Sequence, residues 1–276
     1  MNIYCRLSDV KSRLRIAGTS SDADLLWNME MASRLIESFT NRKFYLKRAV
    51  KYFDIPVGWS SKPLFIPDVY TIITLSLDRS LDRTYSTEIS VDDIYRYPSN
   101  EMYCMKLIPS GFVWPVGLQT VKVDGDWGYQ TREPWRYTTW AIDIDSDVAE
   151  TGTIYPGNSA VEAGMTIQVG DERLYVSSIS QSALYDTATL VRGINGTTAG
   201  GPYVGALVSI GQYDEIIEKM TVLIAARLFN TSGSEGIRNE SLGTRSITYF
   251  FEKESSSGLT LIEENALARF VRTEPV

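Results

Sequence analysis

Two stretches of the sequence carry apolar residues at helical spacing, and they frame a long region of different character. In residues 22–40 the apolar residues recur every three or four positions, which places them on one face of a helix. Ser21 or Asp22 suits the N-cap, and Asp22 and Asp24 suit the positive end of the helix dipole. The second stretch covers residues 216–230. The two stripes contain Leu25, Met29, Ala32, Ile36 and Phe39, and then Ile216, Met220, Leu223 and Ala226.

The region between the stripes is rich in short strand patterns separated by proline and glycine. Residues 43–123 alternate β-branched and aromatic runs with turns, and residues 150–210 form a second such stretch. Gly170-Asp171, between the runs 164–169 and 173–179, is typical of a tight hairpin turn. We therefore expect an α+β fold. Its body, residues 1–149 and 211–276, would be a helical bundle with a β-rich segment between helices, and residues 150–210 would be a small inserted all-β module.

Residue usage argues against most kinds of catalysis. The 276 residues include no histidine, which removes the commonest general base and transition-metal ligand, and the two cysteines, Cys5 and Cys104, form no metal or disulfide pattern. Adjacent acids such as Asp92-Asp93 point apart on a strand or helix, so they do not form a facing carboxylate pair. We expect no catalytic residue, no cofactor site and no metal site.

One acidic stretch matches the first positions of a calcium-binding loop but not the later ones. Asp143, Asp145 and Asp147 alternate as the first ligands of such a loop do, but Val148 and Ile154 stand where glycine and glutamate are needed. The glycine-rich residues 193–201 lack the lysine and the strand-to-helix context of a phosphate loop. We interpret these stretches as a solvated face and a turn.

The charge balance makes a tight nucleic-acid binder improbable on physical grounds. The formal net charge is −7, and no run of lysine and arginine offsets it, so the chain has no general attraction for phosphate. The first residues contain no long apolar run, so we expect neither a signal peptide nor a membrane span. We expect a cytosolic, non-secreted origin and no membrane partner.

The order of several weak motifs resembles the head–tail connector (neck adaptor) family of tailed bacteriophages. An early helix ends in threonine, a basic residue and an aromatic, here within residues 39–44. The β-rich middle ends in a glycine–aromatic–glycine element and a proline, here residues 125–128 and Pro134. A helix then carries Ala225-Ala226-Arg227-Leu228-Phe229, a loop at residues 234–237 follows, and the chain closes with Phe270-Val271-Arg272. Residues 150–210 resemble a module inserted in some members of the family.

The resemblance implies a structural role. Members form a ring, usually of twelve copies, which docks beneath the portal protein, extends the DNA channel and receives the tail or a second neck protein. The virion neck would be the location, and packaged DNA would pass through the lumen without specific binding. A negatively charged lumen would repel the phosphate backbone over about 8–10 Å in physiological salt.

The C-terminal segment is the best candidate for contact with the portal or a neighbouring subunit. A helix over residues 259–272 follows the serine-rich hinge 255–258 and is marginal in isolation, so its apolar stripe needs a groove on its own body or on another subunit. We expect another subunit. The residues expected at this interface are Leu259, Ile262, Ala266, Phe270 and Arg272. Arg192 and Asn195, in the loop of the insert, are a second, more speculative contact.

Two other functions remain open from the sequence. The abundant aromatic residues, with the β insert, are compatible with a carbohydrate- or receptor-binding virion module. An acid/base hydrolase would require two carboxylates that face each other in a cleft.

Overall fold

A computed structural model describes residues 2–155, 160–231, 239–242, 245–248 and 256–272, with the backbone alone at 138–140, 239–242 and 245–248. The protein is mostly β, with 35% strand and 25% helix. The expected helical-bundle body is wrong, because residues 47–127 and 135–211 form two β structures, each with a hydrophobic core of its own. The described helices account for the smaller part of the fold.

The chain divides into two compact units. The first contains residues 1–42, 135–192 and 199–276, and the second contains residues 43–134 and 193–198. The first unit combines the helices with a closed barrel, and the second is built on an open sheet. Among the described helices, none combines the length and the apolar character that crossing a bilayer requires.

The helices of the first unit are α1 (Leu7–Leu14), α2 (Asp22–Thr40), α3 (Glu215–Thr231) and α4 (Leu261–Leu267), followed by the 3-10 turn Ala268–Phe270. The stripe expected in α2 is confirmed at Leu25, Met29, Ala32 and Ile36, which are buried, whereas Phe39 is half-buried. In α3 the expected position Ala226 is buried, but the other buried residues are Ile217, Thr221, Ile224 and Ala225 in place of Ile216, Met220 and Leu223. Because α3 contacts α1, α2 and α4, its buried face is wide. The spacing of apolar residues therefore does not define the centre of that face.

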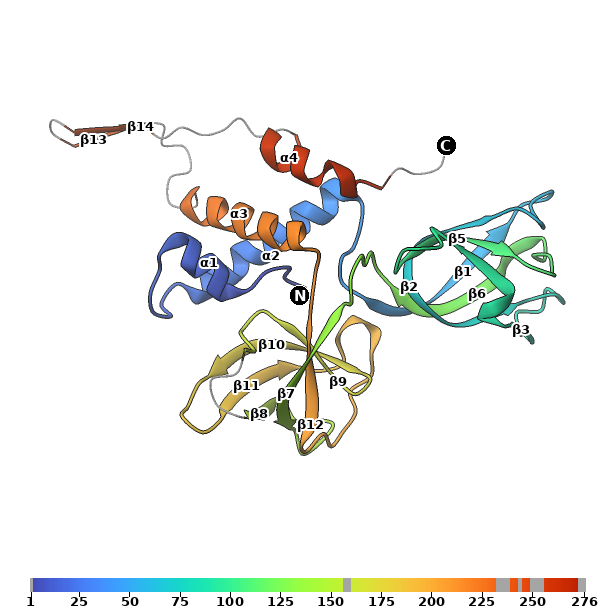
Figure 1. Ribbon diagram of the computed structural model, residues 1–276, viewed down its shortest axis with the longest axis horizontal. Coiled ribbons are helices and arrows are strands. Elements are labelled where there is room, and N and C mark those ends of the chain that lie inside the picture. The colour runs from blue at the N-terminus through green and yellow to red at the C-terminus, as the bar shows by residue number, and fades with distance from the viewer. Residues whose placement is uncertain (1, 156–159, 232–238, 243–244, 249–255, 273–276) are drawn as a thin grey trace. The chain divides into compact units, whose positions relative to one another are not determined.

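The barrel of the first unit has six antiparallel strands: β7 (Trp135–Asp143), β8 (Thr151–Tyr155), β9 (Thr166–Val169), β10 (Glu172–Ser180), β11 (Asp186–Val191) and β12 (Ala206–Gly211). Their order around the closed barrel is β10-β11-β8-β7-β12-β9 (Figure 1). The expected hairpin turn at Gly170-Asp171 is confirmed, because Glu172 pairs with Val169.

The barrel begins earlier in the chain than residue 150, where the sequence places the start of the insert. Strand β7 pairs with β12, with Trp135 opposite Gly211 and Ile142 opposite Ala206. This pairing closes the barrel and joins residues more than sixty positions apart, so no local pattern marks it. The interior is apolar, and Ile142, Ile154, Ile167, Leu174, Val176 and Val208 are among its buried side chains.

The second unit contains β1 (Lys47–Ile55), β2 (Leu64–Leu77), β3 (Thr87–Ile89), β4 (Ile94–Tyr97), β5 (Cys104–Pro109) and β6 (Gly117–Trp127). The strand order is β1-β6-β2-β5-β4, with β3 paired to β2. The glycine–aromatic–glycine element has a packing explanation. A Cβ at Gly125 would lie 2.4 Å from the Thr71 carbonyl oxygen, and one at Gly128 would lie 2.4 Å from that of Tyr45.

The two remaining strands form a small hairpin, β13 (Asn239–Leu242) with β14 (Arg245–Thr248). The sequence pattern of residues 246–251 also favours a strand or an extended arm, and β14 covers its first part, up to Thr248. Residues 249–251, the loop at 234–237 and the first residue of the hinge at 255–258 lie outside the described residues.

Candidate functional site

Three neighbouring barrel strands present polar side chains on their outer surface. In β8, Gly152 and Ile154 point inward, since Ile154 is buried and a Cβ at Gly152 would meet Ile144 at 2.9 Å and Leu190 at 3.2 Å. Because side chains alternate along a strand, Thr151, Thr153 and Tyr155 point outward. The outer face of β8 therefore carries two hydroxyls and an aromatic ring.

The strands on either side bring further polar groups into the same rows. Thr153 lies opposite Asp143 of β7 and opposite Thr187 of β11. Opposed side chains in an antiparallel pair have Cβ atoms about 4.5–5.5 Å apart. One carboxylate and two hydroxyls thus form a row across three strands.

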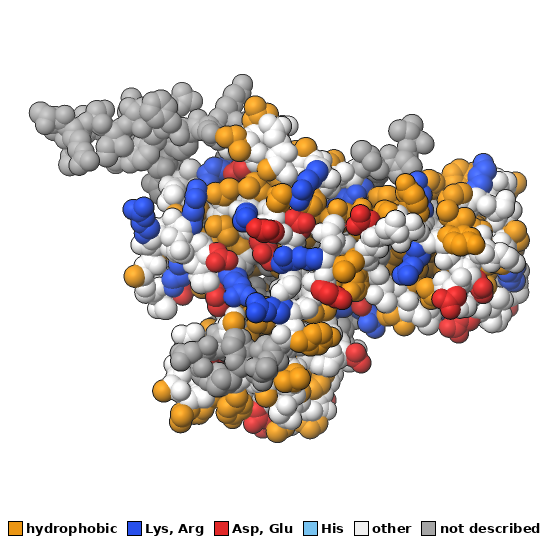
Figure 2. Space-filling view, viewed as in Figure 1, with side chains coloured by type: hydrophobic (Ala, Val, Ile, Leu, Met, Phe, Trp, Pro, Cys, Tyr) orange, Lys and Arg blue, Asp and Glu red, His pale blue; other side chains and the backbone are white. Residues whose placement is uncertain are grey.

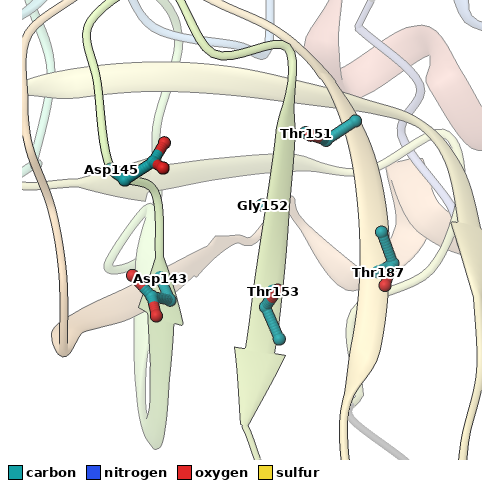
Figure 3. A pocket seen from close by; sticks show the side chains of 6 residues that line it. All are labelled: Asp143, Asp145, Thr151, Gly152, Thr153 and Thr187. Atoms are coloured by element: carbon teal, nitrogen blue, oxygen red, sulfur yellow. The ribbon is translucent and has the colours of Figure 1, made fainter.

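These groups line an open pocket of about 220 Å³. Its walls are Asp143, Asp145, Thr151, Gly152, Thr153 and Thr187. Figure 3 shows the two aspartates on one side and the threonines of β8 and β11 on the other. Among the described residues, no hydrogen bond or ion pair engages the side chains of Asp143, Asp145, Thr153 or Thr187, so their polar atoms are available to a ligand.

Asp147, the third acid of the calcium-like stretch, is exposed and does not line the pocket. Ile154, at the position of the last calcium-loop ligand, is buried in the barrel core. No group of three or more histidine, cysteine or acidic side chains within metal-binding reach occurs in the described part of the chain.

The adjacent acids near the C-terminus hold the fold together. Glu263 accepts hydrogen bonds from Arg227 Nε and Nη2, each 3.1 Å long, and Glu264 accepts one of 2.8 Å from the Ser257 hydroxyl. Thr260 and Glu263 also form a reciprocal capping box at the start of α4. The two carboxylates therefore bind different structural partners and do not face each other.

The structure separates the residues expected at a portal or subunit interface. Leu259 and Phe270 are buried within the first unit, where α4 contacts α2 and α3. Ala266 and Arg272 are half-buried, and the Arg272 backbone N–H donates to the Thr40 carbonyl oxygen at 2.8 Å. Ile262 is 68% exposed, as is its neighbour Leu261. Of the five, Ile262 is the large apolar side chain that remains open to a partner.

The two residues expected at an insert contact also have internal roles. Arg192 pairs with Glu172, with an Nε–Oε1 distance of 2.7 Å, and its side chain is 8% exposed. Asn195 has a left-handed backbone (φ 55°) in the loop 193–198, which belongs to the second unit. In that loop a Cβ at Gly196 would lie 2.0 Å from the Arg48 carbonyl oxygen of β1.

The sequence interpretation missed Thr151, Thr153, Tyr155, Tyr185 and Thr187. The alternation of Thr151-Gly152-Thr153-Ile154-Tyr155 was the available signal, because it predicts a strand with one polar face. Comparisons of the chain with models of protein families, with curated proteins and with solved structures found no match.

Proposed function

We propose that this chain is a structural, non-enzymatic subunit of a tailed-bacteriophage neck. It forms a ring with copies of itself, docks under the portal, extends the DNA channel and receives the tail. The basis is the ordered series of motifs that resembles the head–tail connector family.

The observation that carries the proposal is that three of these motifs lie in contact within the helical group formed by α2, α3 and α4. Arg227, from the alanine-rich motif of α3, binds Glu263 of α4 and donates to the Gly258 carbonyl oxygen at 3.0 Å. Arg272, from the terminal motif, donates its N–H to Thr40 at the end of α2. Segments up to 232 positions apart thus pack as one body, as motifs of a shared architecture would.

Exposed apolar side chains on the same helical group favour an assembling subunit. Trp27 is 68% exposed and Met31 is 42% exposed on α2, and Leu261 and Ile262 are each 68% exposed on α4, which contacts α2. Large apolar side chains that are exposed on two helices in contact with each other can bury their area against a partner. A neighbouring copy of the chain is the partner that a ring supplies for them.

The charge distribution is compatible with a channel through which DNA slides. Acidic side chains outnumber basic ones, 34 to 27, and the two kinds are interspersed on the face drawn in Figure 2. Such a surface neutralises few phosphates and releases few counterions.

The experiment is electron microscopy of the phage particle that contains this protein. A fusion tag placed after Gly170, in the exposed β9–β10 turn, should give extra density in a ring at the neck, below the portal. Particles of a phage mutant that lacks the protein should be DNA-filled heads without tails. Extra density at the tail tip or on the capsid surface, or tailed particles in the absence of the protein, would contradict the proposal.

A further inference from the structure

We infer that the outer face of β7, β8 and β11 binds a neutral saccharide, in the pocket lined by Asp143, Asp145, Thr153 and Thr187 and beside the Tyr155–Tyr185 pair. This inference rests on the barrel alone and does not depend on the neck assignment.

The register of the strands arranges the face in rows. One row is Asp143–Thr153–Thr187, as described above. Two residues further along the strands, Tyr155 lies opposite Ala141. The Tyr155 ring is next to the Tyr185 ring, with their centroids 6.2 Å apart and their planes at 56°. The polar row and the aromatic pair are therefore adjacent on one surface.

The polar row offers the hydrogen-bonding groups that a sugar requires. Each carboxylate has two acceptor oxygens, and each threonine hydroxyl both donates and accepts, so the set complements groups of sugar hydroxyls that also do both. The spacing of about 5 Å between strands is close to the span between hydroxyls on opposite sides of a pyranose ring. An apolar ligand would leave these groups without partners.

A contrast within the same face supports a ligand role. Further along β11, the hydroxyl of Thr189 accepts a hydrogen bond of 3.0 Å from Ser178, so this part of the hydroxyl ladder is satisfied internally. In the pocket row, Asp143, Thr153 and Thr187 have no such partner among the described residues. The groups without a described protein partner thus coincide with the concave part of the face.

The tyrosine pair supplies the apolar half of the recognition. Tyr155 is 41% exposed and Tyr185 is 43% exposed, so each ring retains a face that is open to a ligand. A pyranose ring presents C–H groups on one face and hydroxyls at its edge. An aromatic ring covers the C–H face at low entropic cost, and its own hydroxyl stays hydrated.

The charge of the face sets the class of sugar. Asp143 and Asp145 line the pocket, and Asp147 and Glu150 are exposed in the connection that follows β7. These carboxylates repel sialic acids, uronic acids and sulfated sugars over the Debye length. The expected ligand is therefore a neutral oligosaccharide.

The test uses the full chain on a glycan array that holds neutral, sialylated and sulfated oligosaccharides. We expect retention on at least one neutral structure and on none of the acidic ones. Calorimetry then measures Kd for the best neutral oligosaccharide, with and without EDTA, and EDTA should have no effect. The inference is overturned if no neutral glycan is retained, if acidic glycans bind equally well, or if binding requires calcium, which would assign the carboxylates to a cation.

Variants locate the binding. Asp143→Ala combined with Asp145→Ala should raise Kd about tenfold or more, the effect of losing a charge-assisted hydrogen bond. Tyr155→Ala should weaken binding, whereas Tyr155→Phe, which keeps the ring, should retain most of it. Asp171→Ala is the matched control, because Asp171 is an exposed acid in the β9–β10 turn and does not line the pocket. All variants should keep the wild-type circular dichroism spectrum. An unchanged Kd in the double aspartate variant would place any binding elsewhere.

Discussion

Arg192 and Glu172 form a two-pronged ion pair within the barrel, with Nε–Oε1 and Nη2–Oε2 distances of 2.7 Å each. The Glu172 side chain is fully buried. The same guanidinium donates to the carbonyl oxygens of Ser146, at 2.9 Å, Ala149, at 3.1 Å, and Gly200. Arg192 therefore joins β10 to two loops, and planar bidentate geometry of this kind is specific to arginine.

Arg192→Met should destabilise the protein by about 3–5 kcal/mol, because it removes the counter-charge of the buried Glu172 carboxylate, although the Gly200 N–H still donates to that carboxylate at 3.1 Å. Urea denaturation followed by circular dichroism measures the change. The double variant Arg192→Met/Glu172→Met should recover much of the loss, since it removes both charges. A single variant that loses less than about 1 kcal/mol would show that the pair is not a buried one.

Phe270 and Ile262 provide a matched test of the C-terminal helix. Phe270→Ala should cost about 3–5 kcal/mol, since its side chain is 2% exposed, whereas Ile262→Ala should change stability by less than about 0.5 kcal/mol. Thermal denaturation of the two variants measures the difference. Similar losses would mean that both side chains belong to the same core.

Under the proposed function, Ile262→Asp should fold normally but fail to enter heads, because a charge replaces an apolar contact with a neighbouring copy. Immunoblots of purified particles give the readout. Asn265→Asp, which places the same charge at an exposed polar position of the same helix, should be incorporated normally and serves as the control. Normal incorporation of Ile262→Asp would remove α4 from the contact surface.

Gly196→Ala should release the loop 193–198 from β1, because the new Cβ would lie 2.0 Å from the Arg48 carbonyl oxygen. Hydrogen exchange read by mass spectrometry should show faster exchange in this loop and in β1. Gly58→Ala is the control, since Gly58 also has a positive φ, of 81°, but no atom within 4 Å of an added Cβ. Equal exchange of the loop 193–198 in the two variants would mean that the close approach of Gly196 to Arg48 does not hold the loop on β1.

Tyr4 and Tyr213 should make the protein less stable at alkaline pH. Their ring centroids are 4.7 Å apart, both residues are buried, and burial raises the pKa of each phenol well above its usual value. The unfolded chain releases these protons near pH 10 and the folded chain retains them, so the free energy of unfolding should fall as pH rises above about 10. Below that pH the two groups are neutral in both states and contribute no slope.

Urea denaturation between pH 8 and pH 11.5 measures this dependence. The double variant Tyr4→Phe/Tyr213→Phe should have a shallower slope above pH 10. Tyr137→Phe, at a side chain that is 78% exposed, should keep the wild-type slope. Parallel curves for all three proteins would show that other groups cause the alkaline loss.

Duplex DNA should not bind measurably at physiological salt, because the chain carries a net charge of −7 and few phosphates would be neutralised. Fluorescence anisotropy with a labelled duplex is a suitable measurement. Micromolar binding that weakens steeply with added salt would indicate a DNA-holding surface and contradict a passive channel.

Much of the secondary structure could be predicted because its signals are local. The three- and four-residue spacing of Leu25, Met29, Ala32 and Ile36 places the stripe of α2 on one face, and the helix contains it. The hairpin at Gly170-Asp171 follows from two β-branched runs separated by turn residues. In each case the residues that carry the signal are also neighbours in the folded chain.

The candidate saccharide site shows the limit of such reasoning. The alternation from Thr151 to Tyr155 is sufficient to predict a strand with one polar face. It does not say that Asp143 and Thr187 stand beside Thr153, because that depends on the pairing of three strands. Strand register joins distant positions, and a shift of one residue would turn every side chain of a strand to the opposite face.

For the same reason, neither the fold class nor the burial of individual side chains in the C-terminal segment could be predicted from the sequence alone. The pairing of Trp135 with Gly211 closes the barrel, which is one of the two β structures found in place of the expected helical-bundle body. Nothing in the sequence around either residue predicts this pairing. Leu259 and Phe270 become core while Ile262 stays exposed, since docking against α2 and α3 selects the buried face of α4. Local periodicity thus accounts for the helices and the hairpin. Barrel closure, the burial of Arg192 and the saccharide face arise from contacts between segments whose proximity no local pattern encodes.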